Sequence, residues 1–144
     1  MVGAGVASWG IVLGKDGDYA TAQNPWNPKL VHPLSRAFVE SWIKKYDSPP
    51  TLENVLGYLK FMIFRSAVER AGSLDREKVR KALLETDEET VIGRLRVDKE
   101  KFVGRFITPI YIEQWQNAER EIVWPKEYAT SDLWYPQPPW SKQG

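Results

Sequence analysis

The sequence contains no cysteine, a single histidine and no marked excess of either charge. The lack of cysteine excludes disulfides, thiolate chemistry and cysteine-based zinc sites, and it leaves the cellular compartment open. Because His32 is alone, neither a metal site built on paired histidines nor a histidine-pair acid–base relay can form. Twenty Lys and Arg against nineteen Asp and Glu give a net charge of +1 without a basic block, so we expect no nucleic-acid partner.

Long hydrophobic runs are also missing. No stretch approaches the roughly 18 apolar residues that a membrane span requires. The opening stretch "MVGAGVASWG" has no basic segment leading into an apolar one, so no signal peptide is predicted in this chain. With 42% hydrophobic and 27% charged residues and seven Trp, the composition is typical of a globular protein, and residues 1–144 are predicted to form a single globular unit.

Hydrophobic spacing predicts three helices. The first covers "HPLSRAFVESWIKKY", with Pro33 in its first turn and "DSPP" as its end. The second runs from a cap at Thr51 to a terminator at Gly72. It is apolar on two nearly opposite sides: one holds Leu52, Val55, Leu56, Leu59, Met62 and Ile63, the other Phe61, Phe64 and Val68.

The third helix is indicated by Asp75, which can cap "REKVRKALLE", and by Leu74 and Val79, which are spaced to form a hydrophobic staple. After Thr90 the hydrophobic period changes to two. The stretches "TVIGRLRVD", "FITPIYIEQWQ" and "REIVWP" are predicted strands, the last two joined by the polar turn "QNAE" and ended by Pro125. This order of elements favours an α+β or incomplete α/β domain.

Most candidate chemistry in the sequence has a simpler explanation. Gly3 and Gly5 could begin a dinucleotide-binding loop, but no strand precedes them and no acidic residue follows at the required distance, so a turn is favoured. His32 lies at the start of a predicted helix rather than in a catalytic triad. The carboxylates of "ETDEET" are expected in a solvated loop. No nucleophile, base or metal cluster stands out, so we predict neither an enzyme nor a cofactor.

The stretch "QNPWNPKL" is the stronger candidate for ligand contact. Gln23 offers an amide and Trp26 a flat aromatic face, in a loop after a short apolar run, where α/β proteins place ligand contacts. The alternative, that Trp26 packs over the following helix, stays open. Tyr58, on the side of the second helix, is a further candidate, although an aromatic residue at helical spacing is more often part of a core.

The aromatic and proline-rich stretch "VWPKEYATSDLWYPQPPW" at the C-terminal side has two interpretations. Its "YPQPP" segment could form a polyproline helix that binds an SH3-type partner. However, Trp134, Tyr135 and Trp140 would be costly to leave in water, at about 25 cal/mol per Å². We therefore favour an extended tail, residues 126–144, that packs on its own domain.

Several motifs occur together in one order. They are "GY" at 57–58, "AGSLD" at 71–75, "TVIG" at 90–93, "QW" at 114–115, "VWP" at 123–125, and "YP" through "PW" at 135–140. In this order the chain resembles the C-terminal part of the type I periplasmic-binding-protein family that serves branched-chain amino acid and amide ABC transporters. The stretch "LGKDGDYATAQNPW" is similar to the family's helix end, capped at Gly14, followed by a strand, whereas the pattern of "GKDGD" alone predicts a plain turn.

The resemblance implies an α/β fold: an incomplete type I periplasmic-binding-protein fold with three main helices, a short sheet, a C-terminal hairpin and the extended tail. It implies a receptor that closes two lobes on a small polar solute, docks on ABC permease subunits and works outside the cytoplasm. Gln23, Trp26 and Tyr58 are the expected ligand-binding residues. The alternative is an interaction or structural domain that keeps the fold without transport.

The resemblance covers only a C-terminal portion, so a complete ligand cleft is not expected in this chain. The turn "QNAE" also lacks the glycine that relatives often have. If the helix from 51 to 72 is normally covered on both sides, one apolar face is bare here. We therefore predict homo-oligomers, formed through Phe61, Phe64 and Val68 or through the stripe opposite them.

Overall fold

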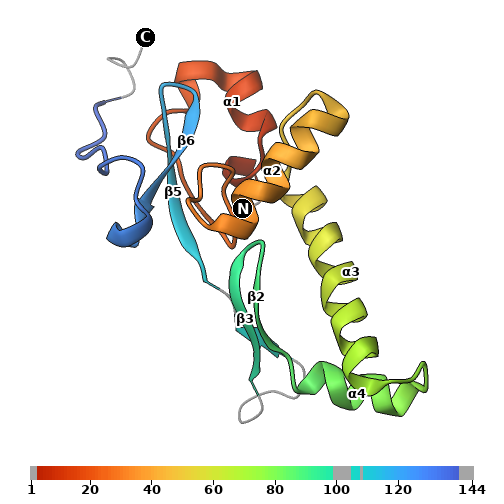
Figure 1. Ribbon diagram of the computed structural model, residues 1–144. Coiled ribbons are helices and arrows are strands. Elements are labelled where there is room, and N and C mark those ends of the chain that lie inside the picture. The colour runs from red at the N-terminus through yellow and green to blue at the C-terminus, as the bar shows by residue number, and fades with distance from the viewer. Residues whose placement is uncertain (1–2, 99–104, 108, 140–144) are drawn as a thin grey trace. The chain divides into compact units, whose positions relative to one another are not determined.

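The computed structural model describes residues 3–98, 105–107 and 109–139 and has a mixed α/β fold, as predicted (Figure 1). The chain divides into two compact units. Unit 1 comprises residues 1–31 and 110–144, and unit 2 comprises residues 32–109. The single globular unit expected over residues 1–144 stays a prediction.

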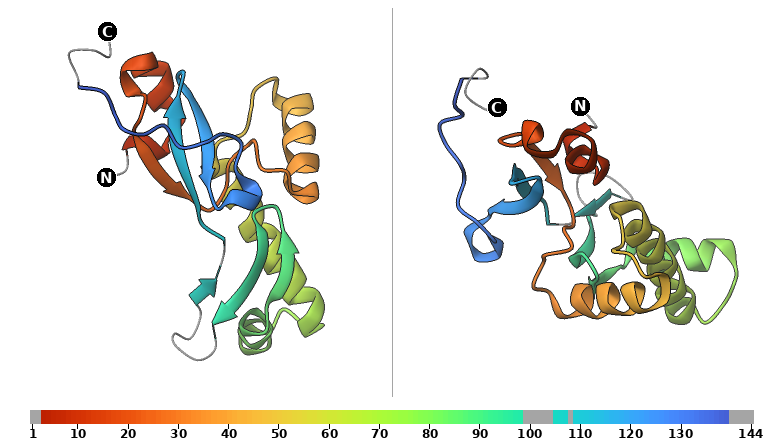
Figure 2. Two further views of the ribbon diagram at one scale, coloured as in Figure 1. Left: turned by 90° about the vertical axis from the view of Figure 1, so that its left-hand side faces the viewer. Right: turned by 90° about the horizontal axis from the view of Figure 1, so that it is seen from above.

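Unit 1 is built on an antiparallel sheet with the strand order β1-β5-β6, visible from two further sides in Figure 2. Its strands are β1 (Thr21–Asn24), β5 (Tyr111–Gln116) and β6 (Glu119–Trp124). Its helical elements are η1 (Gly3–Gly5), α1 (Ser8–Leu13), η2 (Gly14–Gly17) and η3 (Lys126–Tyr128). The helix end at Gly14, which adopts φ 53°, is confirmed, and so is the strand after it. The turn that the pattern of "GKDGD" alone predicted is also present, as the 3₁₀ turn η2 that follows the helix end.

The predicted hairpin between β5 and β6 is confirmed. Its turn residues Asn117 and Ala118 both have positive φ, 55° and 62°, as a tight two-residue hairpin turn requires. Neither residue is glycine, and an L-residue pays for this conformation in steric energy. The carboxylate of Asp18 compensates, because it accepts hydrogen bonds from the backbone N–H groups of Asn117 and Ala118 at 3.0 and 2.9 Å.

Unit 2 contains the three predicted helices, α2 (Pro33–Tyr46), α3 (Leu52–Ala71) and α4 (Arg76–Leu84). Local signals define their ends. Pro33 occupies the first turn of α2, Gly72 ends α3 at φ 57°, and Asp75 caps α4 by accepting the N–H of Lys78 at 3.0 Å. These caps confirm the predicted boundaries.

The inner side of α3 is buried along Val55, Leu59, Ile63 and Ala67. Near its end, Ala67 joins Val79 and Ala82 of α4 in a core cluster. Two expectations were wrong here. Val68 does not belong to a bare surface, because it packs against this cluster. Leu74 forms no staple, because its side chain is 81% exposed and stays in solvent.

A second antiparallel sheet, with the order β2-β3-β4, completes unit 2. Its strands are β2 (Asp87–Thr90), β3 (Gly93–Asp98) and β4 (Arg105–Ile107). The expectation of a loop at "ETDEET" was therefore wrong over β2. The reason is cross-strand charge: Arg94 of β3 donates to the Asp87 carboxylate at 2.8 and 3.0 Å, and these hydrogen bonds lower the pKa of Asp87.

The predicted strand "FITPIYIEQWQ" was also wrong in its extent. It divides into β4 of unit 2 and β5 of unit 1, which belong to different sheets. Thr108, predicted in this strand, and Trp140, predicted in the tail, lie outside the described residues.

Candidate functional site

A groove of about 690 Å³ lies in unit 2 between α2 and α3. The wall formed by α2 includes four large side chains spaced four residues apart, so that they share one side of the helix: Leu34, Phe38, Trp42 and Tyr46. The facing wall comes from α3 and includes Tyr58 and Met62. We call this feature the α2–α3 groove.

Aromatic rings line much of the α2–α3 groove. The ring centroids of Phe38 and Tyr58 are 4.8 Å apart, those of Phe38 and Trp42 5.6 Å, and those of Trp42 and Tyr46 4.3 Å. All three pairs are tilted, which suits the quadrupoles of the rings. Such a surface can accept an apolar or planar group, and Tyr58 is the sequence-predicted site residue that contributes to it.

Charged side chains mark the two ends of the groove. Lys45, in the last turn of α2, lines one end and lies 5.0 Å from the Tyr46 ring centroid. At the other end lie Glu88 and Glu89 of β2, and the ion pair of Arg65 and Glu69 on α3, at 2.7 Å, also lines the groove. Glu88 accepts from Ser66 at 2.9 Å, and Glu89 lies 3.2 Å from the Nε2 atom of His32. His32 immediately precedes α2, so its predicted place at a helix start is confirmed.

The other two predicted site residues lie in unit 1. Gln23 is exposed near the end of β1, and Trp26 follows in the loop after that strand. Trp26 is 0% exposed, so its ring offers no face to a solute in this structure. Gln23 and Trp26 therefore lie close in the sequence and in unit 1, whereas Tyr58 belongs to unit 2.

The loop after β1 is held by a buried carboxylate that sequence reasoning missed. Glu113 of β5 is 1% exposed and accepts hydrogen bonds from the side-chain amides of Asn24 at 2.6 Å and Asn27 at 2.7 Å. Arg120 of β6 lies 3.4 Å from the same carboxylate, and it also donates to the carbonyl of Gly5 at 2.7 Å. Burying a carboxylate is costly without such partners, so this arrangement fixes the loop in one conformation.

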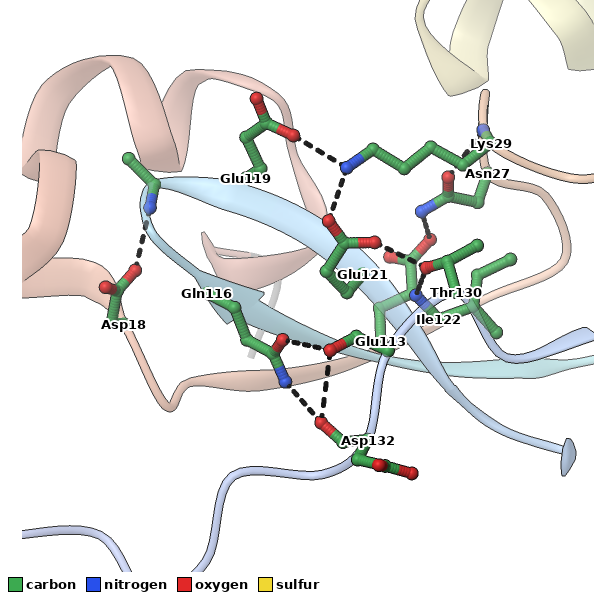
Figure 3. A network of polar contacts seen from close by, with 12 residues as sticks. Asp18, Asn27, Lys29, Glu113, Gln116, Glu119, Glu121, Ile122, Thr130 and Asp132 are labelled. Atoms are coloured by element: carbon green, nitrogen blue, oxygen red, sulfur yellow. Dashed lines mark hydrogen bonds and ion pairs between the residues drawn. The ribbon is translucent and has the colours of Figure 1, made fainter.

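A second polar network joins the same loop to β6 (Figure 3). The ammonium of Lys29 donates to Glu119 at 2.6 Å and to Glu121 at 2.5 Å. Burial lowers the pKa of Lys29, but these two carboxylates outweigh burial and leave its pKa raised. Glu121 also accepts from the Thr130 hydroxyl at 2.5 Å, so the network reaches the C-terminal tail.

The described part of the tail makes further contacts with β5. The Gln114 side chain accepts from the backbone N–H of Trp134 at 2.8 Å and donates to its carbonyl at 3.2 Å. Gln116 accepts from Ser131 at 2.7 Å and donates to the Asp132 carbonyl at 2.8 Å. These contacts support packing of the tail on unit 1 rather than its display to a partner.

The described residues form no nucleotide or metal site around the other candidates in the sequence. Gly3 and Gly5 form the short helix η1. Over residues 3–98, 105–107 and 109–139, no group of His, Cys, Asp and Glu is placed to hold a metal ion. Within those same ranges, no helix has both the length and the apolar character to cross a membrane.

Comparisons with known proteins agree with this fold. The sequence model described as "Periplasmic binding protein" matches residues 3–120. A leucine binding protein from Thermotoga maritima superposes with a TM-score of 0.73 at 27% identity, over 84% of this chain and 34% of its own. A solute binding protein of an ABC transporter from R. palustris, in complex with benzoate, gives 0.69 at 16% identity, over 79% of this chain and 31% of its own.

A third solved structure is the branched-chain amino acid transporter substrate binding protein from Streptococcus pneumoniae in complex with isoleucine. It gives a TM-score of 0.61 at 18% identity and covers 70% of this chain and 28% of its own. This chain therefore spans about a third of the length of the proteins that it matches.

Proposed function

The chain belongs to the periplasmic binding protein family, and we propose that it is a C-terminal part of the solute-binding component of an ABC importer. The proposed solute is an amino acid, an amide or a related small polar molecule. One observation carries the proposal: the family model matches residues 3–120 as one stretch, which includes all of unit 2 and part of unit 1. The 27% identity to a leucine binding protein supports an amino acid as the first solute to test.

The residues proposed to contact solute are Gln23 and Tyr58. Tyr58 is 41% exposed and lines the aromatic α2–α3 groove, which suits the apolar part of an amino acid. Gln23 is exposed at the end of β1, next to the loop that Glu113 holds. Trp26 stays in the proposal as the residue that anchors this loop, because its full burial favours packing.

Partners and location follow from the family and are proposals for this chain. We propose that the complete protein docks on ABC permease subunits and works outside the cytoplasm, and that neither it nor this chain is an enzyme. Self-association through the apolar surface of α3 belongs to the same proposal. The alternative, an interaction or structural domain without transport, is favoured by one observation: the α2–α3 groove leaves Tyr58 and Met62 each 41% exposed.

Binding to a solute panel tests the proposal. The chain would be screened by thermal shift and then by calorimetry with leucine, isoleucine, benzoate and a set of small amides. Because a complete ligand cleft is not expected in this chain, we expect an amino acid or amide to raise the melting temperature only at millimolar concentration. A rise is expected at all because a ligand that binds only the folded state stabilises it.

The Tyr58→Ala variant should lose that rise, whereas Tyr135→Ala, which removes an 85% exposed tyrosine, should keep it. If no solute shifts the transition of the chain, solute binding by this chain is refuted and the interaction-domain alternative stands.

A further inference from the structure

We infer that the α2–α3 groove binds a second copy of this chain, with the two grooves facing each other in antiparallel, two-fold fashion. The proposal narrows self-association to one of the two apolar sides of α3. It does not depend on transport, because it uses only contacts within unit 2. Three observations carry it. The groove exposes a large apolar area, its two ends carry opposite charge, and the opposite side of α3 exposes a smaller apolar area.

Several large apolar side chains that line the groove are about half exposed to solvent. Leu34 is 45% exposed, Tyr46 50%, and Tyr58 and Met62 41% each. At roughly 150–250 Å² for a large side chain, they leave roughly 300–400 Å² per copy uncovered. Specific interfaces bury about 1,200–2,000 Å² in total, of which about 60% is apolar, so two such faces reach the lower end of that range.

The ends of the groove carry opposite charge. Glu89 lies at the N-terminal end of α2, where His32 holds it at 3.2 Å, and Lys45 lies in the last turn of the same helix. The helix has 14 residues, so these charges are separated by about 20 Å along its axis. Glu88 lies at the same end but is paired with Arg70 at 3.8 Å, so Glu89 is the carboxylate available to a second copy.

A two-fold axis converts this polarity into complementarity. When two identical faces pack antiparallel, the basic end of one copy lies opposite the acidic end of the other, and each contact occurs twice. Lys45 of one copy then faces Glu89 of the second copy. A parallel arrangement would place like charges together and is disfavoured.

The opposite side of α3 exposes less apolar area than the groove does. Phe61 and Phe64 are 79% and 51% exposed there, but Val68, the third residue of that stripe, is already packed on the α4 cluster. Two phenyl rings alone provide roughly 200–300 Å² per copy, which is small for a stable interface. Phe64 therefore serves as a matched control for the groove.

Charge reversal tests the arrangement directly, with sedimentation equilibrium of the whole chain as the measurement. The unmodified chain should show a concentration-dependent dimer. Lys45→Glu and Glu89→Lys should each raise the dimer dissociation constant by roughly tenfold or more, because like charges then meet twice. An equimolar mixture of the two variants should recover dimers, because the carboxylate introduced at position 45 of one chain then meets the ammonium introduced at position 89 of the other.

Apolar variants test the face. Met62→Ser should weaken the dimer, whereas Phe64→Ser should not, and circular dichroism should show that both variants remain folded. The inference is overturned if the unmodified chain has the mass of one copy at all micromolar concentrations. It is also overturned if Phe64→Ser weakens the dimer more than Met62→Ser, or if the mixed charge variants stay monomeric.

The solute screen and the mass measurement can fail separately. A dimer would cover Tyr58, so the solute screen is repeated with Lys45→Glu, in which the groove should stay open. No solute response from that variant refutes only solute binding. A solute response in a strictly monomeric chain refutes only the dimer.

Discussion

The Glu113 carboxylate accepts a hydrogen bond of 2.7 Å from the side-chain amide of Asn27 and thereby ties β5 to the loop that follows β1. The same carboxylate is 1% exposed, and the side chain of Arg120, its cationic partner, is 10% exposed. Removing the charge of Glu113 would leave a buried cation without its counter-ion, which is among the costlier changes in a protein interior.

We therefore predict that Glu113→Gln lowers the free energy of unfolding by about 3 kcal/mol. The amide keeps the size of the side chain but carries N–H groups that oppose the donors of Asn24 or Asn27. Urea denaturation followed by circular dichroism measures the loss. The exposed Glu127 provides the control, since Glu127→Gln should change stability by less than about 0.5 kcal/mol. Equal effects of the two substitutions would disprove the stabilising role of the buried Glu113 carboxylate.

Two glycines in helices should respond to alanine in opposite directions. A Cβ at Gly10 of α1 would collide with the Trp115 ring and lie 2.6 Å from the Ala118 carbonyl oxygen, whereas a Cβ at Gly57 of α3 would meet open space. Gly10→Ala should destabilise the chain by about 1–3 kcal/mol through overpacking. Gly57→Ala should stabilise it by about 1 kcal/mol through helix propensity. Thermal melts of both variants decide this, and a stabilised Gly10→Ala would contradict the close packing of α1 on β5.

The response of the chain to alkaline pH should show that Tyr111 is buried in the folded state. Burial, aided by the nearby Tyr128, raises the pKa of Tyr111 from 10.0 to about 12. Because the folded pKa is raised, the stabilisation is complete below pH 10 and is lost as pH rises through about 12. Absorbance titration should show one late-ionising tyrosine, and Tyr111→Phe should abolish it and flatten the loss of stability. Tyr135→Phe, at an 85% exposed position, should leave the late step in place. Persistence of that step in Tyr111→Phe would rule out the assignment.

Truncation after Tyr128 should lower the melting temperature. It removes the hydrogen-bond partners of Gln114 and Gln116, which are 3% and 4% exposed. Each lost hydrogen bond is worth about 0.5–1.5 kcal/mol, and each kcal/mol corresponds to about 2–4 °C in a chain of this size. Truncation after Pro139 keeps Trp134 and serves as the control. An unchanged melting temperature after the longer truncation would restore the interpretation of the tail as a ligand for a partner.

Local signals made the helices predictable. A proline in the first turn of α2, a glycine at Gly72 and a capping Asp75 act over a few residues, so the sequence around each end contains the reason for it. The family resemblance, which rests on several such motifs in order, is confirmed by the match over residues 3–120.

Long-range partners made the rest unpredictable. The acidic run before Thr90 becomes β2 because Arg94 and Arg96 lie opposite it, and its own residues do not reveal that pairing. The same holds for the candidate site. Helical spacing placed Tyr58 on one side of α3, but it did not show which groove that side would line.

The Glu113 network left only a faint signal in the sequence. Its carboxylate joins parts of the chain nearly ninety positions apart, so no local motif contains the network. The clue was the run of polar residues Glu113, Gln114 and Gln116 in a predicted strand, all of which are buried. Polar side chains at buried strand positions indicate partners elsewhere in the chain.

Unit 2 is one continuous stretch of chain, whereas unit 1 consists of two stretches on either side of it in the sequence. The pairing of Thr21 with Gln114 therefore closes a loop that contains all of unit 2. Closing a long loop costs entropy, and compaction of the intervening chain shortens that loop. We expect α3 to gain protection from hydrogen exchange before β5 during refolding, and the reverse order would contradict this. During synthesis, β1 must then wait unpaired until β5 has left the ribosome.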